Sequence, residues 1–193
     1  MNATTVAQAT QVKALPQVQS YDIDAAHSSA SFKVRHLMVS NVRGELGAIS
    51  GRVVIDESDL SRSSVEATID ARAINTRDEK RDAHLRSADF FDVEKHPTVT
   101  FRSTKVENGK GGRLQVTGDL TMHGIAREVT LDVEPLSPEV RDPWGNTKRG
   151  ISATTRLNRK DFEVSWNAAL DGGGLLVGDE VSITIELELG RRA

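Results

Sequence analysis

Histidine is the side chain in this sequence best suited to acid–base or metal chemistry, and it occurs five times, as His27, His36, His84, His96 and His123. Cysteine is absent, which excludes disulfides, thiolate metal sites and thiol nucleophiles. No pair of histidines has a short metal-site spacing such as H-x3-H or HExxH. We therefore expect no metal and mainly structural histidines, with a polar contact to a ligand head group as the alternative.

The other reactive side chains give no catalytic signature. The sequence contains no GxSxG element, which would mark a hydrolytic nucleophile. The paired carboxylates Asp78-Glu79 and Asp179-Glu180 are interpreted as a helix start and a loop. The glycine runs at 111–112 and 172–174 lack the Lys-Ser/Thr of a phosphate-binding loop and indicate turns. The prediction is a protein that is not an enzyme and has no cofactor.

Length and composition indicate one globular domain. The chain has 193 residues, 37% of them hydrophobic and 27% charged, which is enough to bury a core. Its formal net charge of -3, without a basic patch, argues against nucleic acid as a partner. No window approaches the roughly 20 apolar residues of a membrane span.

The first 19 residues are predicted to be a flexible tail, with the folded domain at 20–190. Lys13 is their only charged side chain, and they lack the apolar run of a secretory signal. We therefore expect a cytoplasmic protein, or a periplasmic one if the natural chain starts differently.

Alternating short runs dominate the sequence after residue 20. Eight such runs are separated by turn residues, which is typical of an antiparallel all-β protein and of a closed barrel. They lie at 21–36, 45–56, 64–74, 99–103, 112–122, 127–134, 150–158 and 181–189. His123-Gly124 is predicted to be the turn of a hairpin.

The inward-facing phase of these strands contains several small residues, which would leave room inside a barrel for an elongated apolar ligand. These residues are Ala67, Ala71, Gly118, Ala153 and Thr155. The alternative is that large side chains fill the interior, because periodicity does not measure volume.

The segment 75–101 is the one long stretch that does not alternate, and it is predicted to be helical at about 77–91. Thr76 and Glu79 have capping-box spacing, and Asp82 with Arg86 forms an i,i+4 pair. Because this helix has little apolar surface, we expect it to cover a barrel end. The side chains expected against the barrel are Leu85, Ala88, Phe90 and Phe91, and those expected to face water are Arg77, Lys80 and Arg81.

Five motifs in order resemble the YceI-like family of bacterial lipid-binding proteins. They are YDIDAAHSSASFKVRHLMVSNVRGELG at 21–47, RDAHLRSADFFDVEKHPTVTF at 81–101, GDLTMHGIAREVTLDV at 118–133, DPWGN at 142–146 and GDEVSITIELEL at 178–189. The resemblance implies a lipocalin-like barrel whose tunnel holds a polyprenyl chain or an isoprenoid quinone, and it allows a homodimer. Glu163 stands where the family usually has glycine, so we expect a different loop there.

The leading hypothesis is non-catalytic binding, carriage or storage of a long isoprenoid lipid. The alternatives are an enzyme that acts on a lipid in the same tunnel, and a solid barrel that serves as an interaction module. The head group is expected near His36, His84, Arg81 and Arg86. The residues predicted to bind the ligand are Phe32, Val34, His36, Val65, Ala67, Ile69, Leu85, Phe90, Phe91, Val99, Phe101, Leu114, Val116, Leu120, Val129, Leu131, Ile151, Ala153, Leu157, Ile183 and Ile185.

Overall fold

A computed structural model describes residues 18–170 and 173–192, and within them eleven strands form one antiparallel sheet. The strands are β1 Val18–Ile23, β2 Ser29–His36, β3 Ser40–Glu45, β4 Ile49–Asp56, β5 Ser64–Asp70, β6 Thr98–Asn108, β7 Leu114–Met122, β8 Ile125–Val133, β9 Val140–Arg141, β10 Thr147–Asn158 and β11 Val177–Arg191. The helices are α1 Glu79–Arg86 and the short 3-10 helices η1 Leu60–Arg62, η2 Ala71–Ala73, η3 Lys110–Gly112 and η4 Arg159–Phe162. Among these residues no helix has the length and apolar composition needed to cross a bilayer.

The sheet closes on itself through β11. One edge of β11 pairs with β10 along its length, and the other edge pairs first with β2 and then with β1. The halves β1 and β2 thus act as one interrupted strand, and β3 and β4 act as another beside it. Counted this way, the ring has eight strands, and the predicted eight-stranded antiparallel barrel with one helical segment is confirmed.

Several element boundaries differ from the prediction. β1 begins at Val18, two residues before the expected domain start, while residues 1–17 of the predicted tail lie outside the described residues. The break expected at 37–44 contains β3, because its polar residues face solvent on an outer strand. Asp179 and Glu180 lie inside β11 and not in a loop. Gly172 of the glycine run lies outside the described residues.

The β7–β8 hairpin follows the sequence pattern closely. Val116 and Met122 of the inward phase are buried, and Asp119 of the outward phase is exposed. The turn places His123 at φ 53° and Gly124 at φ 75°, the geometry of a type I′ turn. The hairpin prediction is therefore confirmed.

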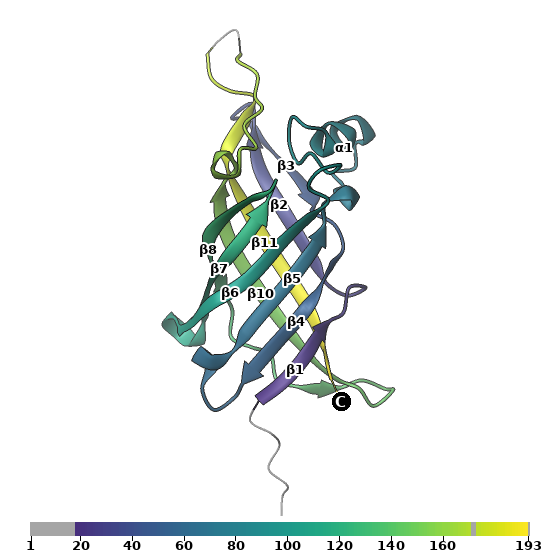
Figure 1. Cartoon of the computed structure of the whole chain (residues 1–193), viewed down its shortest axis with the longest axis vertical. Helices are drawn as coiled ribbons and strands as arrows, with labels where there is room; N and C mark the ends of the chain where they lie inside the picture. The colour runs from purple at the N-terminus through teal and green to yellow at the C-terminus, as the bar shows by residue number, and fades with distance from the viewer. Residues whose placement is uncertain (1–17, 171–172, 193) are drawn as a thin grey trace, which may run out of the picture.

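The barrel has two different ends (Figure 1). One end, called the helix end below, carries α1, the turn 37–39 between β2 and β3, and the loop that precedes β11. The opposite end carries the start of β1, the segment 134–146 and the C-terminal end of β11.

Helix α1 begins later than predicted. Its N-cap is Asp78, whose carboxylate accepts a hydrogen bond from the backbone N–H of Arg81, so the predicted capping box at Thr76 is wrong. The predicted pair between Asp82 and Arg86 is also wrong. Asp82 is buried and accepts bonds from the Thr76 backbone N–H and hydroxyl, and Arg86 donates to the Ile74 carbonyl.

Candidate ligand-binding cavity

The barrel encloses a cavity of about 610 Å³, within the range typical of ligand sites. All of the ligand-binding residues predicted from the sequence lie on its wall. Their role in binding stays a prediction, whereas the cavity itself contradicts the solid-core alternative.

The predicted small residues divide into two groups. Ala67, Ala153 and Thr155 line the cavity, as the space argument requires. Gly118 does not, because a Cβ there would lie 2.7 Å from the Phe101 ring and 2.3 Å from the Arg102 carbonyl oxygen. Ala71 is buried in the wall cluster around Phe90 and so adds no space. Gly118 therefore permits close packing of β6 on β7.

Sequence reasoning left several lining residues out of the site. Ile49, Val53 and Ile55 of β4 share one inward phase, a signal that was present in the sequence. Leu136 and Trp166 also line the cavity, but they lie in loops, where no periodic pattern marks them.

The ionisable residues on the cavity wall gather at the helix end. They are Arg35, His36, Asp78, Lys80, Arg81, His84 and Arg159, and the rest of the described wall is apolar apart from a few hydroxyl groups. A cavity with an apolar body and polar groups at one end suits an amphiphile with a long tail and a polar head. Of the predicted head-group residues, His36, His84 and Arg81 lie here, while Arg86 is turned toward Ile74.

An aromatic cluster borders this polar end. The His84 ring packs edge-on against Phe90 and Trp166, with centroid distances of 5.0 and 4.7 Å. A ring nitrogen of His84 lies 2.8 Å from the Asp89 carboxylate, which fixes the ring orientation. At this end of the cavity the cluster therefore forms a part of the wall that is apolar except at His84.

The predicted lid is partly correct. Leu85, Phe90 and Phe91 line the cavity, and Arg77 and Lys80 are exposed. Ala88 is exposed, because the helix ends at Arg86 and the chain turns before Ala88 can reach the barrel.

Arg81 is also not a free surface cation. Its guanidinium donates to the Thr76 hydroxyl at 2.7 Å and to the Thr76 carbonyl at 3.0 Å. The Thr76 hydroxyl in turn donates to Asp82, so Arg81 and Asp82 hold α1 onto the segment before it.

Arg159 is a buried cation beside the same end, 4% exposed. Its guanidinium donates to the carbonyl oxygens of Val164, Trp166 and Gly178 at 2.6 to 2.9 Å. Burial lowers the pKa of Arg159, and the nearby Asp179 carboxylate, at 3.6 Å, opposes that shift. Arg159 thus ties η4 and the loop before β11 together. Glu163, at φ 58°, supplies the left-handed turn after η4 that glycine would adopt more easily.

The opposite end is covered by apolar residues and ion pairs. Leu60 and Leu136 pack on the buried clusters there. Outside them, Arg149 donates to the Ser137 carbonyl and pairs with Glu57. Tyr21 is fully buried, and its hydroxyl donates to Glu139 at 2.6 Å. Desolvation and the Glu139 carboxylate raise the Tyr21 pKa.

A second set of charges at this end joins the turn after β1 to β10 and β11. Lys148 Nζ lies 2.8 Å from the Asp24 carboxylate and 3.0 Å from that of Glu188. The hydrogen bond from Lys148, with a further one from His27, lowers the Asp24 pKa to about 2. These contacts hold β10, β11 and the turn after β1 together at the barrel end where no ionisable residue of the described wall lines the cavity.

Two groups of side chains have the donor types and proximity to hold a metal ion. In Asp92, His96 and His123, as in Asp24, His27 and Glu188, the possible ligand atoms lie within 4.8 Å of one another. In the first group, however, Lys95 already pairs with Asp92 and is the main cause of the lowered pKa of that carboxyl. His123 Nδ1 also contacts the Phe162 carbonyl oxygen at 3.1 Å. Both groups are accounted for by these structural contacts.

Fold and cavity together define a lipocalin-like barrel with an apolar lumen and one polar end. Residues 21–189 match the YceI-like domain, and the chain belongs to that family. A UPF0312 protein of Vibrio parahaemolyticus is 39% identical over 150 residues, which cover 77% of this chain and 79% of the relative.

Several solved structures share the fold, including the two that follow. The structure of BcnA from Burkholderia cenocepacia has a TM-score of 0.75 and 25% identity, with 86% of this chain and 98% of that chain covered. A polyisoprenoid-binding domain from Saccharophagus degradans has a TM-score of 0.64 and 15% identity, with coverages of 90% and 99%. At that identity the second likeness concerns the fold alone.

Proposed function

We propose that the protein binds a long-chain isoprenoid lipid, a polyprenyl chain or an isoprenoid quinone, in the barrel cavity, and carries or stores it unchanged. The observation that carries the proposal is the apolar cavity of about 610 Å³ with its ionisable residues at one end. Membership of the YceI-like family and the fold shared with a polyisoprenoid-binding domain support the same ligand class.

Burial of the tail supplies the affinity. Each methylene moved out of water contributes about 0.8 kcal/mol, so one five-carbon isoprene unit contributes about 4 kcal/mol before ordering costs. A few buried units therefore suffice for tight binding. Chain length is selected by how far the apolar wall extends, because a unit left in water contributes nothing.

We propose, by elimination, that the head group lies at the helix end. A phosphate or quinone oxygen buried against Leu60 or Leu136 would lose its hydrogen bonds to water. At the other end, the exposed Lys80 and the half-buried His36 can donate to it. In the described residues neither side chain forms an ion pair within 4 Å, although the charge of Lys80 contributes to the lowered pKa of Asp78.

A non-catalytic role agrees with how the polar wall residues are used. His84 is held by Asp89 and by two aromatic rings, and Arg159 by backbone carbonyls. These contacts position the loops and leave neither group directed at a reacting bond.

The direct test is mass spectrometry of an organic extract of the purified protein, followed by binding of added polyprenyl and quinone ligands of different lengths. Ala67→Phe places a ring in the lumen, because Ala67 lines the cavity midway along β5. We expect it to abolish binding of long chains and to spare short ones. Thr68→Phe on the outer face of the same strand is the control and should change neither. Failure of every added isoprenoid to bind would refute the proposal.

A further inference from the structure

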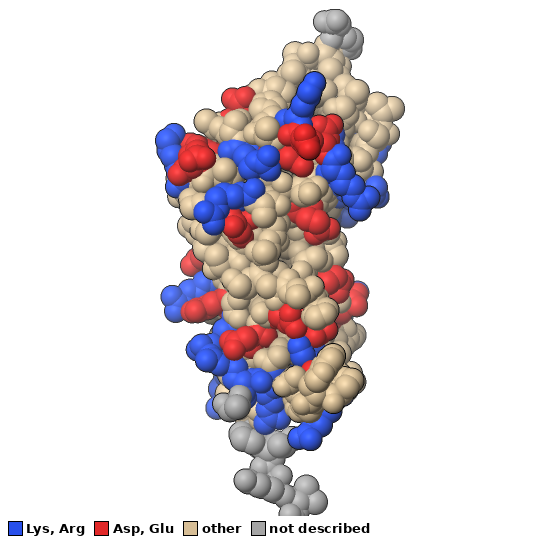
Figure 2. Space-filling view, turned by 90° about the vertical axis from the view of Figure 1, so that its right-hand side faces the viewer, with Lys and Arg blue, Asp and Glu red and all other residues tan. Residues whose placement is uncertain are grey.

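The turn between β2 and β3 presents three consecutive apolar residues to solvent at the helix end. Leu37, Met38 and Val39 have exposed fractions of 39%, 63% and 75%. A backbone hydrogen bond from Leu37 to Leu176 joins the turn to the loop before β11, where Leu175 is 41% exposed. Figure 2 shows the extremity of this end as a tan surface beyond a band of mixed charge.

The backbone of this turn is strained. Leu37 has φ 52° and Met38 has φ 58°, so both central residues of a type I′ turn are left-handed without being Gly, Asn or Asp. The β7–β8 turn has the same geometry and uses His123 and Gly124. An Asn-Gly pair at 37–38 would relieve the strain and remove exposed apolar surface. The Leu-Met pair is unfavourable for the free protein on both counts, which points to a role in binding.

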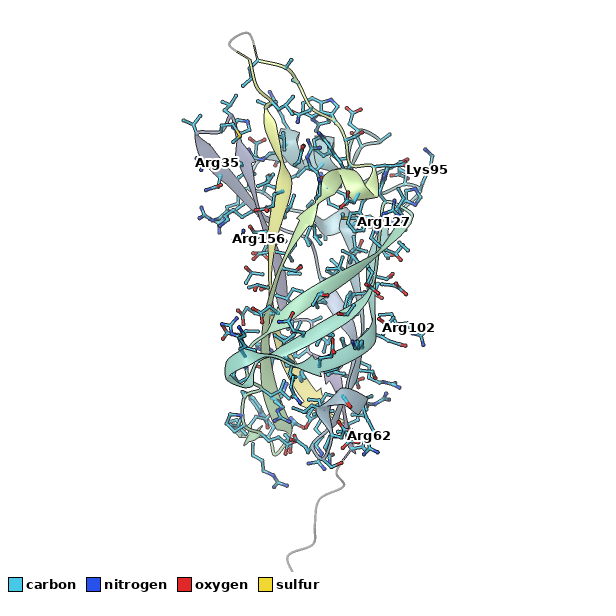
Figure 3. All side chains as sticks on the ribbon, turned by 90° about the vertical axis from the view of Figure 1, so that its left-hand side faces the viewer. Arg35, Arg62, Lys95, Arg102, Arg127 and Arg156 are labelled. Atoms are coloured by element: carbon cyan, nitrogen blue, oxygen red, sulfur yellow. The ribbon has the colours of Figure 1, made fainter. Side chains whose placement is uncertain are left out.

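Cations flank the apolar turn on the two strands that lead to it. Residues 33–43 contain Lys33, Arg35 and Arg43 and no acidic residue. Lys33 and Arg43 lie directly opposite each other in the β2–β3 register, an arrangement that like charges disfavour. Within the described residues none of the three cations forms an ion pair. Figure 3 shows Arg35 near the tip of this hairpin.

The same hairpin borders the polar end of the cavity. Arg35, His36 and Val42 lie on the cavity wall as well as beside the turn, and so does Leu176, which is bonded to it. A surface that bound this turn would therefore lie next to the polar end of the cavity.

We propose that the turn 37–39 and the cations beside it dock the helix end on an anionic lipid membrane. The apolar side chains enter the interface while Lys33, Arg35 and Arg43 meet lipid phosphates, which is the chemistry of peripheral membrane anchors. The docking proposal depends only on the features of the hairpin. The further step, that docking allows the lipid to exchange between the bilayer and the barrel, rests on the function proposed above.

The test is flotation of the full chain with vesicles of phosphatidylcholine, with and without phosphatidylglycerol. We expect binding to the anionic vesicles that weakens with salt. The double variant Leu37→Asn, Met38→Gly should lower it by about tenfold or more, through loss of apolar burial. The same variant should resist denaturant as well as the parent or better, because its turn is unstrained, so the loss would not reflect misfolding.

Two further variants separate the alternatives. Lys33→Gln with Arg43→Gln should weaken binding to anionic vesicles by about fivefold per cation. Trp144→Ser removes a side chain 84% exposed at the opposite end, and should leave binding unchanged. Loss of binding in the Trp144 variant and not in the turn variant would overturn the proposal.

Two other results would also overturn it. One is the absence of vesicle binding by the parent. The other is a turn variant that changes sedimentation from dimer to monomer, which would make the turn a contact between copies. Isoprenoid binding measured without vesicles stays independent of all three variants, so failure of docking is distinguishable from failure of the proposed function.

Discussion

The two ends of the barrel use polar groups in opposite ways. At the end opposite α1, charged side chains bind one another across separate segments, as Arg149 does with Glu57 and Lys148 does with Asp24. At the helix end, Arg159 and Arg81 donate mainly to backbone carbonyls, Arg159 to those of the loops around η4 and β11 and Arg81 to that of Thr76. The first pattern closes an end, because it ties elements together. The second holds loops in place and leaves ionisable side chains such as Lys80 and His36 on the cavity wall.

This difference separates stability from ligand access. We therefore expect that loss of a contact at the opposite end leaves the wall residues at the helix end unchanged. We also expect that a change around α1 leaves the barrel closed by β11. Variants that each remove one contact should therefore differ between the two ends. Some should change only the free energy of unfolding, and others should also change the lipid affinity.

The largest effect is expected for Arg159→Met. It leaves the carbonyl oxygens of Val164, Trp166 and Gly178 without their donor. The bond to Val164 is buried and the other two are part-buried. A buried unsatisfied group costs about 1–3 kcal/mol and a typical hydrogen bond contributes about 0.5–1.5 kcal/mol, so we expect a total loss of about 2–6 kcal/mol in the free energy of unfolding. Lipid affinity should fall as well, because Val164 and Trp166 line the cavity. Urea unfolding and ligand titration measure the two effects; unchanged affinity would show that these loops do not form the binding end.

Arg149→Met tests the other end and should affect stability alone. The Arg149 side chain is 9% exposed and links Ser137 to Glu57. Its loss frees one part-buried carbonyl and one half-exposed carboxylate, and we expect about 2–3 kcal/mol of destabilisation in urea. The titration midpoint for a long isoprenoid should stay at the parent value. A parallel loss of affinity would mean that this end also contacts the ligand.

Asp82→Ala should loosen α1 without unfolding the barrel. The buried carboxylate accepts two bonds from Thr76, and a bond to a charged group contributes about 1.5–3 kcal/mol. We expect faster amide hydrogen exchange in residues 75–91, faster lipid release and a global unfolding midpoint close to that of the parent. Asp82→Asn keeps an acceptor oxygen and serves as the matched control. Equal exchange in Asp82→Ala and the parent would show that this network does not hold the helix.

Alternation along the strands was enough to predict the barrel and most of its lining from the strands. Side chains alternate between the two faces of a strand, so the place of Val116 and Ile183 in that alternation predicted that they line the cavity. The helix end was predicted less well because its contacts are not periodic. Thr76 has capping-box spacing but bonds to Asp82, and Trp166 reaches the lumen from a loop. Closure by one long strand, β11, that pairs along one edge with the two halves of an interrupted strand also leaves no local signal.

The smallest effect concerns pH at the end opposite α1. The Asp24 pKa is lowered to about 2 by Lys148 and His27, below its ordinary value of 3.8. A lowered pKa means that the folded state favours the carboxylate, so this stabilisation is present above about pH 4 and is lost as the pH falls toward 2. Asp24→Asn should therefore be less stable than the parent at pH 6, and the two urea midpoints should converge near pH 2.

Lipid affinity at pH 6 should be the same in the parent and in Asp24→Asn, because Asp24 does not line the cavity. Parallel pH profiles of the two proteins would show that the Lys148 contact does not stabilise the folded state. A lower lipid affinity would contradict the separation of the two ends, because a charge network remote from α1 would then control the polar end of the cavity.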